Sequence, residues 1–233
     1  ARIESMVFKH DVALLKLALP KAPPFAFYAG QYIDLLLPGN VSRSYSIANS
    51  PDQEGILELH IRRRENGVCS EMIFGNEPKV KEKGIVRVKG PLGSFTLQED
   101  SSKPIILLAT GTGYAPIRSI LLDLIRQDSS RAVHLYWGAR HQDDLYALEE
   151  AQELTGRLKN ARFSPVLSKA DGCWQGEKGY VQTAAAKDYP DLSSYEVYAC
   201  GSVAMIESAK SVLTAQCSLP ETAFYSDAFS PAQ

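Results

Sequence analysis

The feature that most constrains the fold is the apolar segment PIILLA at residues 104–109, which runs directly into GTGYAP and then into an apolar helical pattern over residues 117–125. A strand without polar alternation is typical of one buried on both faces, as in a parallel sheet. Strand and helix patterns alternate after it, with strands over 133–139, 161–167, 196–200 and 223–226 and helices over 144–158, 181–189 and 203–216. This alternation predicts a parallel-sheet, doubly wound α/β domain over residues 101–233.

The first hundred residues have a different pattern. Turn signals separate six β-prone stretches, at residues 12–19, 31–37, 42–49, 56–63, 85–90 and 94–97. We therefore expect a six-stranded antiparallel barrel over residues 1–100, interrupted by one helix from about Cys69 to Gly75. The polar segment QEDSSK at 98–103 marks the boundary between the two domains.

Composition excludes several classes of function. The 25 Lys and Arg residues nearly balance the 27 Asp and Glu residues, which argues against a nucleic-acid-binding protein. The longest uncharged apolar run contains glycines and is too short to span a membrane, and no signal peptide is apparent. The histidines lack metal-ligand spacing, and Cys69, Cys173, Cys200 and Cys217 form no C-x-x-C pair. We therefore expect no metal site, free thiols and a cytoplasmic protein.

The segment GTGYAP begins like the dinucleotide fingerprint G-x-G-x-x-G, but Pro116 stands in place of the third glycine. Gly111 and Gly113 allow a sharp turn and a close approach to a phosphate, and the N-terminus of the following helix favours an anion. Proline is suited to the first position of that helix. A nucleotide-binding loop and a plain turn between strand and helix are both compatible with this segment.

Three further segments are candidates. In RSYS (43–46), Arg43 is suited to a phosphate and Tyr45, on the same strand face, to a flat ring, although the pair also fits an ordinary exposed strand. HIRRRENGVCS (60–70) places arginines before the start of a helix, as a diphosphate site or as a solvated run of charge. In ACGS (199–202), Cys200 ends a strand at the carboxyl edge of the sheet or is a buried small side chain.

The order of these motifs, together with GPLGSF and YWGAR, resembles the ferredoxin–NADP reductase superfamily from about Val12 to Phe229. Within it, the chain is similar to the flavin and nicotinamide modules of oxygenase reductases, including deoxysugar-dehydrase reductases. Standalone NAD(P)H–flavin reductases are a near alternative.

The resemblance implies roles for particular residues. Ser46 lies near flavin N5, Cys200 near the nicotinamide and Phe229 over the flavin, and these three are the implied catalytic residues. The implied flavin-binding residues are Arg43, Ser44, Tyr45, Ser46, His60, Ile61, Arg62, Gly67, Val68, Cys69 and Ser70. The implied nucleotide-binding residues are Gly111, Thr112, Gly113, Pro116, Arg140, Cys200, Gly201 and Phe229.

The activity implied by this resemblance is hydride transfer from NADH or NADPH to bound FAD, rather than FMN, and then single-electron transfer to an iron–sulfur centre. The chain lacks the C-x4-C-x2-C spacing of a [2Fe–2S] domain and an initiator Met, so we expect that domain upstream in the same polypeptide, or a separate ferredoxin or oxygenase component. The alternative is a standalone oxidoreductase that reduces free flavin; Arg62 and Arg63 favour retained flavin. Asp143 and Asp144, beside Arg140, favour NADH over NADPH.

Overall fold

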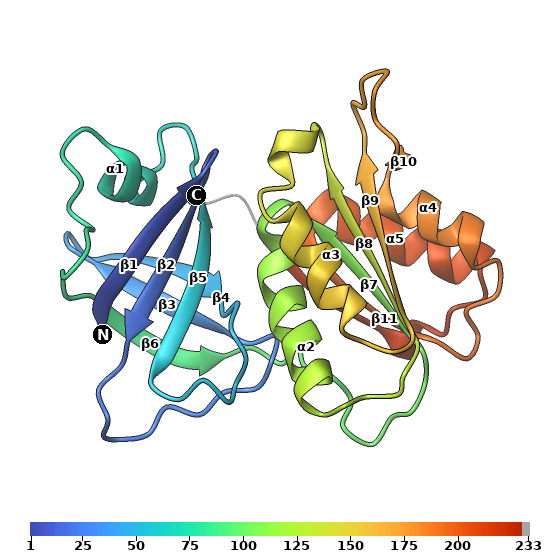
Figure 1. The fold of residues 1–233 in the computed structure, drawn as a ribbon, viewed down its shortest axis with the longest axis horizontal. Helices are drawn as coiled ribbons and strands as arrows, with labels where there is room; N and C mark the ends of the chain where they lie inside the picture. The colour runs from blue at the N-terminus through green and yellow to red at the C-terminus, as the bar shows by residue number, and fades with distance from the viewer. Residues whose placement is uncertain (230–233) are drawn as a thin grey trace.

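The computed structural model describes residues 1–229. Its first part contains two three-stranded antiparallel sheets, ordered β1-β2-β5 and β4-β3-β6, which isolated bridges between Arg2 and Ile85 and between Ile47 and Leu59 join into a barrel-like unit (Figure 1). The strands are β1 (Arg2–Lys9), β2 (Val12–Ala18), β3 (Tyr32–Leu37), β4 (Val41–Ser46), β5 (Ile56–Arg62) and β6 (Arg87–Leu92). Alternate residues of β2, β3 and β5 point inward and form its apolar core. The short helix α1 (Val68–Phe74) packs beside β4.

Two expectations for this barrel are wrong. Strand β1 was not predicted because Ile3 is its one fully buried residue, so its sequence lacks the alternation of a half-buried strand. Residues 94–97 are not a strand. Phe95 is buried in the core of the second domain and meets the ring of Tyr198 edge-on, with ring centroids 6.1 Å apart. Its apolar character therefore reflects packing between the domains.

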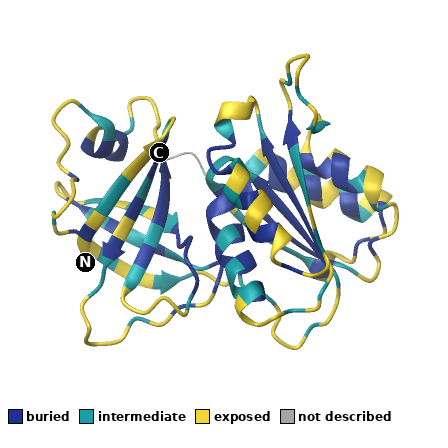
Figure 2. Cartoon of the chain, in the orientation of Figure 1, coloured by how far each residue is buried: buried dark blue, intermediate teal, exposed yellow. Residues whose placement is uncertain are grey.

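The second part is a six-stranded parallel sheet of order β10-β9-β8-β7-β11-β12. Its strands are β7 (Ile105–Thr110), β8 (Val133–Ala139), β9 (Ala161–Leu167), β10 (Glu177–Lys178), β11 (Glu196–Ser202) and β12 (Phe224–Phe229), and its helices are α2 (Tyr114–Arg126), α3 (Leu148–Gly156), α4 (Val181–Asp188) and α5 (Val203–Gln216). Helices α2 and α3 cover one face, while α4 and α5 cover the other (Figure 1). The central strands are buried on both faces, as Figure 2 shows, which explains the uninterrupted apolar sequence of β7.

The chain order of this sheet creates a switch point between β7 and β11. From β7 the chain proceeds outward through β8, β9 and β10, and then returns to place β11 on the other side of β7. Open α/β sheets bind ligands outside the carboxyl ends of the strands at such a point. The loop after β7 is the 3₁₀ turn Gly111–Gly113, so GTGYAP lies at the switch point.

Three local expectations for the second domain differ from the structure. Helix α2 begins at Tyr114, so Pro116 is its third residue rather than its first; the third N–H of a helix also lacks an intrahelical partner, and proline is tolerated there. Helix α3 is shorter than residues 144–158, because a separate 3₁₀ turn at Gln142–Asp144 precedes it. The two-residue strand β10 has too few residues to give a sequence pattern.

The two domains share an apolar core. Val12, Ala29 and Phe95 from the first part belong to the same buried cluster as α2 and the facing side of the parallel sheet. Of the helices within residues 1–229, none is long and apolar enough to cross a membrane.

Candidate active site at the junction of the domains

Two loops meet at the carboxyl edge of the parallel sheet, one after β7 and one at the end of β11. A Cβ on Gly113 would fall on the carbonyl group of Cys200, 2.6 Å from its carbon atom. A Cβ on Gly201, whose φ is 151°, would collide with the side chain of Thr110. The two backbones can approach this closely because position 113 is glycine, and glycine at 201 leaves the space that the Thr110 side chain occupies.

The turn after β7 is held from the sheet. Trp137 of β8 donates its ring N–H to the carbonyl of Gly111 at 3.0 Å and stacks on Tyr114, with ring centroids 4.1 Å apart. Gly111 has a φ of 55°, in the left-handed region that glycine adopts without strain. No side chain caps α2 at Gly113, and Thr112 beside it is half-buried. The N–H of Tyr114 already donates to the carbonyls of Gly111 and Thr112, and Pro116 has no N–H, so the positive end of the α2 dipole rather than a row of free amides favours an anion at this edge.

Cys200 and Phe229 come from neighbouring strands of the same edge. Cys200 lies opposite Asp227 of β12, and Phe229 ends that strand opposite Ser202. Burial and the charge of Asp227 raise the pKa of the Cys200 thiol well above its usual value, so the thiol is protonated at neutral pH. Phe229 is half-buried against the core shared by the domains.

Ser46 is the clearest sign of a ligand on the barrel side. It ends β4, is 6% exposed, and its hydroxyl makes no hydrogen bond with any part of the chain that the structure describes. A buried hydroxyl without a partner costs about 1–3 kcal/mol. Ser50, Tyr114 and Gln182 also have a buried polar atom without a partner in the described chain, so the position of Ser46 at the end of β4 is what makes it a candidate ligand contact. A polar atom of a bound ring would supply the missing partner, so this site fits a flavin.

Arg43 and Tyr45 lie together on β4, as their alternate spacing predicts. The Tyr45 hydroxyl is 2.9 Å from the Cys69 sulfur, and burial raises the pKa of both groups. Arg43 donates to the carbonyl of Ser42 at 2.8 Å. Ser44 points to the other face of the strand and donates to Asp34 at 2.7 Å, so its side chain is not beside Arg43 and Tyr45.

Helix α1 begins beside this pair. Gly67 is its N-cap and provides no side-chain cap, and the side chain of Val68 is exposed. The Ser70 hydroxyl is buried and accepts from the backbone N–H of Arg64 at 2.7 Å. The side chain of Ser70 therefore stabilises the loop before the helix, and its proposed contact with a phosphate stays a prediction.

The three residues at the end of β5 have separate environments. The side chain of Ile61 is buried in the barrel core, so only its main chain is available to a ligand. Both ring nitrogens of His60 are engaged, by the Tyr146 hydroxyl at 2.8 Å and by Glu58 at 3.1 Å. Burial lowers the pKa of His60, which is therefore neutral at neutral pH.

Arg62 bridges the domains. Its guanidinium donates to Asp11 at 2.6 Å and, across the junction, to Asp144 at 2.9 Å. A Cβ on Gly111 would lie 3.0 Å from its third nitrogen, so Arg62 lies directly against the turn after β7. The end of β5 and the nucleotide loop are thus in contact.

Arg140 follows β8 at the same edge and is exposed, with no ion pair to any residue within the described range. Asp144 is less available than its sequence position suggested, because Arg62 binds one of its oxygens and the backbone N–H of His141 the other. Sequence reasoning missed this pairing, and it also missed Arg118 and Ser119, which connect α2 to the barrel. The one available signal was their position directly after GTGYAPI.

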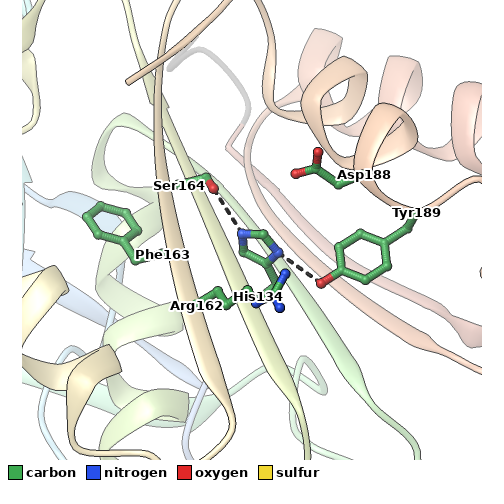
Figure 3. A pocket seen from close by; sticks show the side chains of 6 residues that line it. All are labelled: His134, Arg162, Phe163, Ser164, Asp188 and Tyr189. Carbon is green, nitrogen blue, oxygen red and sulfur yellow. Dashed lines mark hydrogen bonds between the residues drawn. The ribbon is translucent and has the colours of Figure 1, made fainter. Parts of the chain in front are cut away.

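A hollow of about 570 Å³ lies at the opposite end of the sheet (Figure 3). It is lined by His134, Arg162, Phe163, Ser164, Asp188 and Tyr189. His134 bonds Tyr189 and Ser164, both at 2.9 Å, so its nitrogens are satisfied within the protein. None of the predicted cofactor residues lies there, and no group of potential metal ligands is found among residues 1–229.

Comparison with known proteins gives one family match for the barrel and one for the parallel-sheet domain. Residues 3–97 match the family model of the oxidoreductase FAD-binding domain, and residues 107–211 match that of the oxidoreductase NAD-binding domain. The fold and the site therefore define an oxidoreductase that uses FAD and NADH or NADPH. The chain belongs to the ferredoxin–NADP reductase superfamily.

Three known proteins illustrate the relationship. A CDP-6-deoxy-L-threo-D-glycero-4-hexulose-3-dehydrase reductase from Yersinia pestis is 42% identical over the whole chain, which spans 69% of its length. An NAD(P)H-flavin reductase from Vibrio harveyi is 35% identical, with 88% of each protein covered. The crystal structure of the Amycolatopsis cytochrome P450 reductase GcoB superimposes with a TM-score of 0.90 and 32% identity, over the whole chain and 70% of that protein.

Proposed function

We propose that the chain holds FAD in its barrel, accepts a hydride from NADH and passes the electrons one at a time to an iron–sulfur centre. The observation that carries this proposal is the buried, unpartnered hydroxyl of Ser46 at the end of β4. Bound flavin supplies the chemistry that the side chains lack, because it accepts a hydride and releases single electrons.

The residues of the chain would bind and orient the two cofactors. The glycine turn, at the positive end of the α2 dipole, would bind the pyrophosphate of the nicotinamide cofactor, with Thr112 and Pro116 shaping the turn. Gly201 lets the Thr110 side chain pack directly against the end of β11, beside Cys200, where the nicotinamide ring would lie. The protonated thiol of Cys200 places no charge there, and Phe229 excludes water from the reacting faces.

The flavin would lie along β4 and β5. Arg43 binds its phosphate, Tyr45 packs on its ring and Ser46 hydrogen-bonds the edge that receives the hydride. The remaining contacts are to the main chain near His60, Ile61 and Arg62 and to the start of α1, at Gly67, Val68, Cys69 and Ser70. Precise placement of two rings accounts for most of the acceleration in this scheme, which needs no acid–base pair.

The electron acceptor is proposed from the relatives. Two of them are a dehydrase reductase and a cytochrome P450 reductase, both longer than this chain. We infer an iron–sulfur acceptor of the [2Fe–2S] type, carried in the same polypeptide or in a separate ferredoxin or oxygenase component. We propose that the boundary between the domains lies within residues 98–103, and the gap between the two family matches supports this. Free cysteines within the described chain support a reducing, cytoplasmic setting.

NADH is the proposed cofactor. Arg140 is free to meet a 2′-phosphate, but Asp143 and Asp144 follow within four residues. Asp144 retains only part of its influence, because Arg62 neutralises its charge. NADPH is therefore a slower second donor rather than an excluded one.

One observation favours the second candidate, a standalone NAD(P)H:flavin oxidoreductase. Arg62 is engaged by Asp11 and Asp144, so its guanidinium is not free to retain the flavin diphosphate. A reductase of free flavin binds flavin loosely, as a substrate.

Gel filtration in the presence of FAD separates the two candidates. The primary proposal predicts a yellow protein that keeps stoichiometric FAD, is bleached by anaerobic NADH and reduces a one-electron iron–sulfur acceptor. Loss of the flavin on the column, with activity that saturates in added free flavin, would establish the alternative. A protein that stays colourless and reduces neither acceptor would refute both.

A further inference from the structure

Helix α2 carries the nucleotide loop at one end and is hydrogen-bonded to the barrel in its middle. The Arg118 guanidinium donates to the carbonyl of Ala48 at 2.7 Å, and the Ser119 hydroxyl donates to the carbonyl of Asn49 at 2.7 Å. Both carbonyls belong to the buried segment that follows Ser46. The two hydrogen bonds therefore connect the segment beside the proposed flavin edge to the helix beside the proposed nicotinamide site.

The links between these positions are short and rigid. Gly113, which packs on the backbone of Cys200, is six residues from Ser119, or about 9 Å along the helix. Ser46 is two residues from Ala48, or about 7 Å along an extended chain. No flexible loop intervenes on either side, so a change at the contact is transmitted directly to both cofactor sites.

The barrel side of the contact is itself fixed. The Asn49 side chain donates to the carbonyl of Ile56 at 3.0 Å and accepts from the backbone N–H of Glu58 at 2.8 Å. The backbone N–H of Ala48 donates to the carbonyl of Glu58 at 2.8 Å. The segment after Ser46 is thus bonded to β5 and cannot adjust independently of the barrel.

Arg118 is also fixed on its own side. Its side chain is 13% exposed and is bound by Glu150 at 2.7 Å, with Glu58 at 3.7 Å. Burial alone would lower its pKa, but these two carboxylates keep it raised, so the guanidinium is charged whenever the contact forms. The charge of Arg118 is therefore held by α3, by β5 and by the segment after β4, which together give it one stable position.

We infer that Arg118 and Ser119 are positioning residues that set the distance between the flavin edge at Ser46 and the nicotinamide site at Gly113 and Cys200. This inference rests on the proposed function. A misplacement of about 1 Å between reacting groups can reduce a rate about a hundredfold, so loss of either bond slows hydride transfer without touching a cofactor.

The test compares Arg118→Gln and Ser119→Ala with a matched control. Arg131 is also a buried arginine, and it also donates to a main-chain carbonyl, that of Lys103 at 2.6 Å, and to a carboxylate, Glu196 at 2.7 Å. It lies at the amino edge of the parallel sheet, away from the junction. Arg131→Gln therefore measures the loss of a buried arginine that does not connect the domains.

The measurement is the rate of flavin reduction at saturating NADH in anaerobic stopped flow, with the long-wavelength charge-transfer absorbance of stacked nicotinamide and flavin rings as a second signal. We expect Arg118→Gln to lower the rate about ten- to a hundredfold and Ser119→Ala about three- to tenfold, each with unchanged FAD affinity and weaker charge-transfer absorbance. Arg131→Gln keeps the wild-type rate. In the flavin-free protein, Arg118→Gln increases hydrogen exchange at the amides of Ile47 and Ala48.

Two results would overturn the inference: wild-type rates in both junction variants, or a loss no greater than that in Arg131→Gln. If Arg118→Gln does not fold, Ser119→Ala decides by the same criterion, since it removes one hydroxyl. If NADH does not bleach the flavin bound to the wild-type protein, the proposed function is refuted instead. That outcome does not depend on the ratio of flavin-reduction rates between the variants and the wild type.

Discussion

Substituting Gly113 by alanine tests the close contact between the two loops of the site. The φ of Gly113 is −59°, which alanine adopts readily, so backbone strain plays no part. The added Cβ would lie on the Cys200 carbonyl, 2.6 Å from its carbon and 2.9 Å from the nitrogen of Gly201. The effect of the substitution is therefore a collision of the added methyl group with the backbone at the end of β11.

The size of the effect follows from these distances. Ordinary contacts of a Cβ begin at 3.4 Å, so the turn and the end of β11 must separate by about 1 Å. Overpacking of this kind costs about 1–3 kcal/mol of stability. A shift of about 1 Å at a reacting centre lowers the rate about a hundredfold. We expect a folded, flavin-binding protein in which flavin reduction by NADH is about a hundred times slower.

The control is Gly156→Ala at the end of α3, where an added Cβ meets nothing within 4 Å. This variant should reduce flavin at the wild-type rate and gain about 0.5–1 kcal/mol of stability. The assay is anaerobic stopped flow, with FAD binding followed separately by fluorescence titration. A Gly113→Ala protein that reduces its flavin within twofold of wild type would show that the loops do not set the nicotinamide position.

Three further predictions concern single side chains. Ser46→Ala removes a hydroxyl that has no protein partner, so the flavin-free protein should be as stable as wild type or up to about 1 kcal/mol more stable, while flavin reduction slows about tenfold. A thermal melt measures the stability and stopped flow measures the rate. Lost stability would mean that the hydroxyl is hydrogen-bonded within the protein. Arg43→Ala should weaken FAD binding about ten- to a hundredfold in a fluorescence titration, whereas Arg87→Ala, on exposed β6, should not; equal affinities would place the phosphate elsewhere. Burial lowers the pKa of His134 from 6.5 to about 4, so between these values the unfolded chain binds a proton that the folded chain does not, and stability falls by about 2–3 kcal/mol as the pH drops through this range. In urea titrations, His134→Gln should flatten the dependence of the free energy of unfolding on pH over this range. A pH dependence parallel to that of the wild type would show that His134 is not its source.

Much of the fold follows from the sequence. Strands β8 and β9 and helix α5 have the predicted limits, because parallel strands and amphipathic helices repeat a strong local pattern. Strand β1 was not predicted, because Ile3 is its one fully buried residue, and residues 94–97 were predicted as a strand although Phe95 packs against the second domain. Local pattern cannot report a contact between domains.

The site residues also fall into a group that the sequence predicts and a group that it does not. Gly113, Cys200 and Phe229 end neighbouring strands or follow them directly, and chain order alone brings strand ends of a parallel sheet together. The pairings of Arg62 with Asp144 and of Arg118 with Ala48 join residues about 80 and 70 positions apart. These pairings depend on how the two domains pack together, which the local sequence pattern of neither domain specifies.

The central claim is that NADH transfers a hydride to flavin held between the two domains. The most direct measurement mixes the FAD-loaded protein anaerobically with NADH deuterated at the transferred position of C4 and follows the flavin absorbance. We predict rapid bleaching that is several times slower with the deuterated donor than with ordinary NADH. Flavin that stays oxidised, or bleaching that proceeds at the same rate with both donors and is equally fast in Gly113→Ala, would contradict it.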